Sequence, residues 1–310
     1  MAAFKDRGTF LENITFMALM AAIVVIASVF AAFVPLGAVL VMIALPLPSA
    51  IVAYYCRPRF YAIYLFGAIG LAIAATAWNF SSTLFYTIPA VLTGLLYGFS
   101  KRKGASIALA IFLVAILGVG LSYLSILLIR LIYEVDMPSF LLGLVGLGDS
   151  ESTKRLILAA IFTYSLVQAA LSNLFINLQT QPLPSRQTSG KLVLLYPVYG
   201  LFLLAILLIL SFFEESFSYA LLIGSLYWLV FSFTEALPFS RKWIYAPLGL
   251  LFLLGVFFFY FFFQKLPLEK AILLLACPIA GLLLGIMINN FRLFKQSGDP
   301  TINEQGKDQC

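Results

Sequence analysis

The chain has 310 residues, of which 63% are hydrophobic and only 10% are charged. A globule of this size in water needs more polar surface than such a chain supplies, so the composition excludes a soluble fold and predicts an all-α polytopic membrane protein. The formal net charge is +6, but short loops beside a bilayer account for the excess cations, and we expect no nucleic-acid partner. The chain contains no histidine, which excludes histidine-dependent catalysis.

Ten apolar segments follow one another along the chain, each about long enough to cross a bilayer as a helix of roughly 20 residues. The predicted spans are residues 15–34, 37–55, 61–78, 82–99, 105–133, 156–178, 192–213, 217–233, 243–263 and 271–291. Fourteen lysines and arginines lie on the side of the N-terminus and five on the other side. By the positive-inside rule both termini are cytoplasmic, and we predict a multi-pass protein of the bacterial cell (plasma) membrane.

Cysteine-accessibility labelling in intact cells checks this orientation. We expect Asp149→Cys to react with an impermeant thiol reagent and Lys101→Cys to be protected, because the loop at Asp149 is net acidic and the loop at Lys101 is cationic. Labelling of position 101 from outside would show that the predicted topology is inverted.

Two connections are longer than a simple turn and divide the chain into parts. The outer loop over residues 134–155 contains an apolar, Gly-rich piece, 138–148, that is too short to span and should lie at the interface or re-enter the protein. The second connection is polar and carries Pro and Ser, as linkers do. We predict a six-helix bundle over 1–180, a cytoplasmic linker over 181–191, a four-helix bundle over 192–294 and a disordered cytoplasmic tail over 295–310.

Small residues recur four apart within several spans, a spacing that lets two helices approach closely in lipid. The pairs are Ala18 with Ala22, Ala27 with Ala31, Gly94 with Gly98 and Gly281 with Gly285. Each pair can form a docking face for another protein or can pack inside the chain's own bundle, and the spacing alone leaves both interpretations open. The sequence Leu45-Pro-Leu-Pro-Ser49 predicts an interruption of the second span, which can line a site or be a plain kink.

Aromatic and hydrogen-bonding side chains gather at the predicted outer ends of the third to sixth spans. A small-molecule pocket needs such walls with a few placed polar groups. The candidate substrate-binding residues are Trp78, Asn79, Tyr86, Tyr123, Arg130, Tyr164 and Gln168. The competing interpretation is an aromatic belt at the membrane border, with Arg130 paired to Glu134 or reaching outward.

Several kinds of chemistry are not expected of this chain. No acidic residue lies in the middle of a predicted span, which argues against a proton-coupled carrier, and no Walker A pattern is present for ATP hydrolysis. Cys56, Cys277 and Cys310 are too far apart in sequence to form a disulfide framework or a C-x-x-C metal site. We predict no catalytic residue, no cofactor and no metal site, and therefore no enzyme.

The first 180 residues resemble the six-helix substrate-binding (S) subunit of energy-coupling-factor transporters. The resemblance rests on the Ala-rich first span, on the Pro-broken second span ending in Tyr54-Tyr-Cys-Arg-Pro-Arg59, and on the stretch from Ile88 to Lys103. The whole chain, with its added C-terminal helices, is similar to the YybS-like family of bacterial membrane proteins. The resemblance implies capture of a small, vitamin-like nutrient and docking on a transmembrane coupling protein with two ATPases. Ala18 and Ala22 match the Ala-x-x-x-Ala docking motif of the energy-coupling-factor substrate-binding subunits.

Two other classes of function compete with transport. A non-transporting scaffold in envelope assembly or division would only position partners and needs no cavity. A membrane enzyme acting on lipids ranks lowest, because no cluster of acids with Ser, Cys or Lys converges at one depth.

Overall fold

The computed structural model of the protein describes residues 9–34, 42–79, 83–134, 151–179, 190–211, 215–236 and 275–297, with the single positions 136, 139, 143 and 255. Over these residues all regular structure is helical, in agreement with the predicted all-α class. The chain divides into two compact units. The first unit comprises Met1–Asp149 and Ala160–Arg186, and the second comprises Ser150–Ala159 and Gln187–Cys310.

Several predicted features fall outside the described residues. They are nearly all of the apolar piece 138–148, residues 181–189 of the linker, nearly all of the ninth span (243–263) and residues 298–310 of the tail. Two ends of the predicted segments differ in the structure. A helix begins at Gly190, inside the predicted linker, and another continues to Ser297, three residues into the predicted tail.

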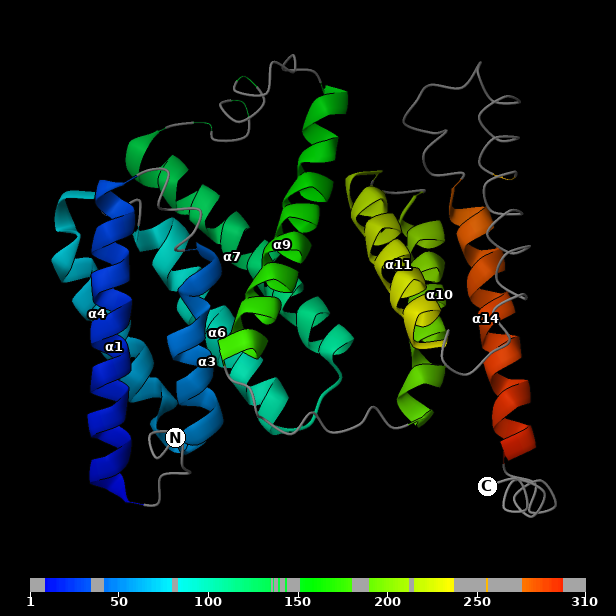
Figure 1. The fold of residues 1–310 in the computed structure, drawn as a ribbon. Coiled ribbons are helices and arrows are strands. Elements are labelled where there is room, and N and C mark those ends of the chain that lie inside the picture. The colour runs from blue at the N-terminus through cyan, green and yellow to red at the C-terminus, as the bar shows by residue number, and fades with distance from the viewer. Residues whose placement is uncertain are drawn as a thin grey trace, which may run out of the picture. The chain divides into compact units, whose positions relative to one another are not determined.

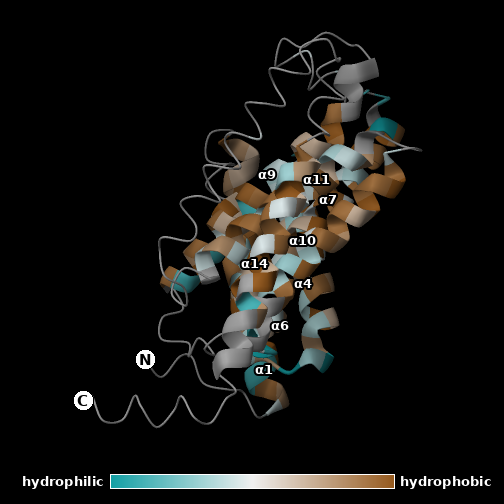
Figure 2. Cartoon of the chain, turned by 90° about the vertical axis from the view of Figure 1, so that its right-hand side faces the viewer, coloured by the Kyte–Doolittle hydropathy of each residue, from teal (hydrophilic) through white to brown (hydrophobic). Residues whose placement is uncertain are grey.

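Among the described residues, five helices are long and apolar enough to cross a membrane: Phe10–Phe33, Pro58–Ala75, Ile107–Ile132, Leu156–Leu178 and Phe217–Thr234. Three shorter apolar helices accompany them, namely Met42–Tyr55, Leu195–Leu210 and Ala276–Ile288. Hydrophobic residues predominate on the visible faces of the helices (Figure 2). These helices fit a lipid bilayer as their surroundings, whereas the count of ten spans and the cytoplasmic termini stay predictions.

The first unit is built from helices and short helical turns (Figure 1). In chain order they are α1 (Phe10–Phe33), α3 (Pro46–Tyr55), η1 (Pro58–Phe60), α4 (Tyr61–Ala75), η2 (Ala77–Asn79), the π-helical turn η3 (Thr83–Thr87), α6 (Ile88–Arg102), α7 (Ile107–Tyr133) and α9 (Glu151–Gln179), which belongs to this unit from Ala160 onward. A capping box starts α1: the Glu12 amide donates to Thr9 Oγ1 at 3.3 Å, and the Thr9 amide donates to Glu12 Oε2 at 3.2 Å. The Ser106 hydroxyl caps α7 by accepting from the Leu109 amide.

The closest helix pair of this unit is α3 with α6, and glycine makes it possible. The predicted interruption of the second span takes the form of a turn at Leu45, after which α3 begins at Pro46. A Cβ atom added to Gly94 would overlap the carbonyl oxygen of Pro46, and one added to Gly98 would overlap that of Ala50. The Gly94 and Gly98 pair therefore packs inside the chain's own bundle, whereas nothing lies within 4 Å of a Cβ added to Gly281.

Buried hydroxyl groups tie η3 to the helices around it. Thr87 Oγ1 donates to Ser28 Oγ of α1 at 2.8 Å, and the hydroxyls of Thr83 and Thr76 share a hydrogen bond across to the end of α4. All four side chains are at most 2% exposed. Because a lone hydroxyl is costly in an apolar interior, these pairs fix the π-helical turn against α1 and α4.

The second unit packs α10 (Gly190–Leu210), α11 (Glu215–Ala236) and α14 (Ala276–Ser297) side by side (Figure 1). Its largest buried side chain is Trp228 of α11, which lies 5.4 Å from the ring of Tyr196 and 5.0 Å from that of Tyr199, both on α10. Gly200 lets α10 approach closely, since a Cβ there would lie 2.7 Å from Leu283 of α14. This unit is thus a packed helical core centred on an aromatic cluster.

Candidate functional site

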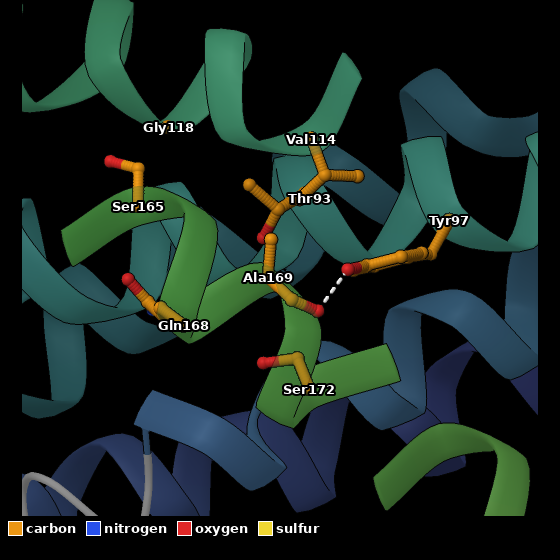
Figure 3. Close-up of a pocket in the computed structure, with 8 residues that line it drawn as sticks. All are labelled: Thr93, Tyr97, Val114, Gly118, Ser165, Gln168, Ala169 and Ser172. Carbon is orange, nitrogen blue, oxygen red and sulfur yellow. Dashed lines mark hydrogen bonds between the residues drawn. The ribbon is translucent and has the colours of Figure 1, made fainter. Parts of the chain in front are cut away.

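A small polar cavity lies between α6, α7 and α9, near the middle of each helix (Figure 3). Its lining consists of Thr93, Tyr97, Val114, Gly118, Ser165, Gln168, Ala169 and Ser172. The space open to the centre of a water-sized sphere is about 20 Å³, which is room for one or two water molecules. All eight residues belong to the first unit, so the cavity is internal to it.

Three polar side chains of α9 face this cavity. Ser165, Gln168 and Ser172 are spaced three and four residues apart and so share one face of the helix. Ser172 is 2% exposed, and its hydroxyl has no hydrogen-bond partner. Among the described residues, nothing hydrogen-bonds to the side chains of Ser165 or Gln168 either. The unpartnered Ser172 hydroxyl and the polar side chains of Ser165 and Gln168 therefore converge on one space.

The opposite wall, on α6, is already hydrogen-bonded. Thr93 Oγ1 donates to the carbonyl oxygen of Pro89 at 2.7 Å. The Tyr97 hydroxyl donates to the carbonyl oxygen of Ala169, the contact dashed in Figure 3. Because both hydroxyl hydrogens are used, neither oxygen has a hydrogen left to donate to the cavity.

Contacts on either side hold the three helices around this space. The rings of Phe112 on α7 and Phe162 on α9 meet edge to face at 6.1 Å. At the other end, Lys101 Nζ of α6 donates to Asn177 Oδ1 of α9 at 2.6 Å. Gly118 leaves the α7 wall open, since a Cβ there would lie 3.3 Å from Ser165 Oγ. The space thus lies where Gly118 faces Ser165, between the ring contact of Phe112 with Phe162 and the hydrogen bond of Lys101 to Asn177.

Of the seven predicted substrate-binding residues, Gln168 lines the cavity. Tyr164, one turn earlier on α9, is 50% exposed and donates to Met42 Sδ at 3.2 Å. Tyr86 lies near this side chain.

The structure does not place the other four predicted residues at the cavity. Trp78 is 60% exposed and packs on Phe33, as a residue of an aromatic belt does. Asn79 donates to the carbonyl oxygen of Ala32 at 3.4 Å. Tyr123 and Arg130 are exposed on α7. Tyr86 and Tyr164 do not line the cavity either, and the predicted pocket at the outer helix ends stays a prediction.

The sequence analysis missed four polar residues of the cavity, Thr93, Tyr97, Ser165 and Ser172. The signal that could have found two of them is the spacing of Ser165, Gln168 and Ser172 on one face of an otherwise apolar helix. For metals, the described part of the chain holds no group of three or more Cys, Asp or Glu side chains that could bind an ion.

The two alanine pairs of α1 have different surroundings. Ala18 and Ala22 are exposed on the described surface of the chain. Ala31 is buried at 6% exposure, and Ala27 is partly buried against the core of the first unit. One pair is thus available to another helix, and the other packs internally.

Comparisons with protein-family models, with curated proteins and with solved structures find no match to this chain.

Proposed function

We propose that the protein is an integral membrane subunit that binds a small, vitamin-like nutrient in its first unit and works with an energy-coupled transmembrane partner. The observation that carries this proposal is the cavity at the middle of α6, α7 and α9, where the buried Ser172 hydroxyl has no partner and the side chains of Ser165 and Gln168 line the same space. Unsatisfied polar groups are costly in the middle of a bilayer, so a bundle that only positions partners gains nothing from them. A binding subunit uses them to hold a ligand.

The exposed alanine pair of α1 supports docking on a partner. Ala18 and Ala22 lie one turn apart on an exposed face of α1, and another face of this helix packs against α3 and α4. Close helix approach in lipid depends on such small residues. A transmembrane coupling protein that carries two ATPases is the partner we propose for this face.

The double variant Ala18→Leu/Ala22→Leu tests the proposal. We expect normal membrane abundance and melting in detergent, with loss of the coupling protein and its ATPases from a pull-down, because leucine adds bulk where the two helices must meet. A matched control adds equal bulk at other exposed alanines, Ala74→Leu/Ala170→Leu, and should keep the partner. Ala31→Leu, at a buried position, should instead destabilise the protein itself.

Purification without added ligand, followed by mass spectrometry, reads out both ligand and partner. We expect a copurifying small molecule together with an ATPase-linked membrane chain. Recovery of neither would overturn the transport proposal in favour of a scaffold in envelope assembly or division. Unfolding of the Ala18→Leu/Ala22→Leu variant would show that these alanines pack internally and would remove the docking argument.

A further inference from the structure

The hydrogen-bonding pattern of the cavity restricts what can fill it. Thr93 and Tyr97 have no hydroxyl hydrogen to offer a ligand, because those hydrogens are donated to the carbonyls of Pro89 and Ala169. On the opposite side, Ser165, Ser172 and the amide of Gln168 can each donate and accept. A group that satisfies both walls must therefore donate toward α6 and pair in either sense with α9.

The charges on the three helices restrict it further. On α6 the nearest cations are Lys101, which donates to Asn177, and Arg102, which donates to the carbonyl oxygen of Cys56. On α7 the described basic residue is Arg130, exposed near the far end of the helix, and α9 carries no charged residue from 156 to 179. A carboxylate has no hydrogen to donate to the oxygens of Thr93 and Tyr97, and an ammonium would have no anionic partner on the described parts of these helices, so both are strongly unfavourable there.

The size of the space sets the last restriction. About 20 Å³ accepts one or two water molecules or a polar group of similar size, and not a whole nutrient. Water both donates and accepts, so it satisfies the same walls when no ligand is present.

We infer that this cavity binds an uncharged hydroxyl or carboxamide group at one end of the ligand, which replaces resident water between α6 and α9. The inference rests on the proposed binding function and names the chemical class of its ligand. The α6 oxygens accept from the group, and Ser165, Gln168 and Ser172 complete its hydrogen bonds. The remainder of the molecule must lie outside this space.

Thiol labelling of Ser172→Cys tests the inference, in a protein whose native cysteines are replaced (Cys56→Ala, Cys277→Ala, Cys310→Ala) and which is reconstituted in nanodiscs. The probes are three methanethiosulfonates of similar size, carrying a hydroxyethyl, a sulfonatoethyl or a trimethylammonioethyl group. Intact-mass rates are normalised to those at exposed Lys103→Cys. We expect the hydroxyethyl reagent to react more than about tenfold faster than either charged reagent, given the cost of a charge at this depth.

Two further variants separate the cavity from a route through lipid. Adding Gly118→Val should fill the space beside Ser165 and slow the hydroxyethyl reaction at position 172. The same Gly118→Val change should not slow the reaction at Val167→Cys, on an exposed face of α9. Melting curves confirm that each variant is folded.

The outcomes are distinct. Equal normalised rates for charged and uncharged reagents would overturn the inference that the ligand group is neutral, and the proposed binding function would stand. Reaction with none of the reagents would show a closed space that holds water only and would also overturn it. Failure of the proposed function itself is measured separately, as absence of a partner in the pull-down with intact Ala18 and Ala22.

Discussion

Replacing Gly98 with alanine should destabilise the first unit by about 3 kcal/mol or more, the upper end for added bulk in a packed core. The new methyl group would overlap the carbonyl oxygen of Ala50 and lie 2.7 Å from Ala53 Cβ. Backbone cannot yield as a side chain can, so α3 and α6 would have to separate along their whole contact. Thermal melting in detergent, followed by the fraction of protein that stays monodisperse, measures the loss.

A matched glycine on α4 provides the control. Nothing lies within 4 Å of a Cβ added to Gly70, which is exposed in the middle of its helix. Gly70→Ala should therefore leave the melting temperature unchanged or raise it slightly, since alanine is about 1 kcal/mol better than glycine in a helix. Equal melting of Gly98→Ala and the unmodified protein would contradict the close α3 and α6 contact.

Only the local part of this contact could be predicted from the sequence. The interruption near Pro46 followed from proline chemistry, which is local, and α3 begins at that residue. The role of Gly94 and Gly98 depended on α3, more than 40 residues earlier in the chain, and spacing carries no information about the partner. The spacing of these glycines is therefore compatible with docking on a partner and with internal packing alike.

The residues of the candidate site, too, could be predicted only in part from the sequence. Polar and aromatic residues at helix ends are abundant in membrane proteins, so Trp78 and Tyr123 matched a pocket and a belt equally well. Which face of α9 is enclosed depends on where α6 and α7 lie. The sequence therefore could not show that Ser172 and Thr93 line a cavity. Gln168 was found because a polar side chain within an apolar span is unusual in itself.

Two faces of α6 make different kinds of contact in the first unit. Gly94 and Gly98 make one face flat and dry against α3, which fixes α6 in place. Thr93 and Tyr97, one position earlier in each turn, present oxygen atoms to the cavity and to α9. One side of α6 is therefore a rigid contact, and the other borders a small space with polar groups in its wall.

At the cytoplasmic end as predicted, α9 is held to α6 by Lys101 and Asn177, and Asn177→Leu should destabilise the protein at neutral pH more than Lys101→Met. The Lys101 ammonium is half-buried and follows the predicted span that ends at Phe99. Asn177→Leu removes an acceptor at 2.6 Å while the charge stays, whereas Lys101→Met removes the charge as well. We expect a loss of about 1 kcal/mol for Asn177→Leu, at the low end for a charged hydrogen bond because half of the group is solvated.

The pH dependence gives this prediction its sharper form. Burial lowers the pKa of Lys101 below its ordinary value of 10.5 in the folded protein. The unfolded chain then binds more protons than the folded one between the lowered pKa and 10.5, so stability rises with pH across that window. Loss of the Asn177 acceptor lowers the folded pKa further and steepens the rise.

Melting temperatures from pH 7 to 10 separate the two variants. Asn177→Leu should regain part of its lost stability as the pH increases, because a neutral amine no longer needs the acceptor. Lys101→Met lacks the titrating group, so its melting temperature should show none of that gain. If the two variants have the same pH slope, the lowered pKa of Lys101 does not depend on its contact with Asn177.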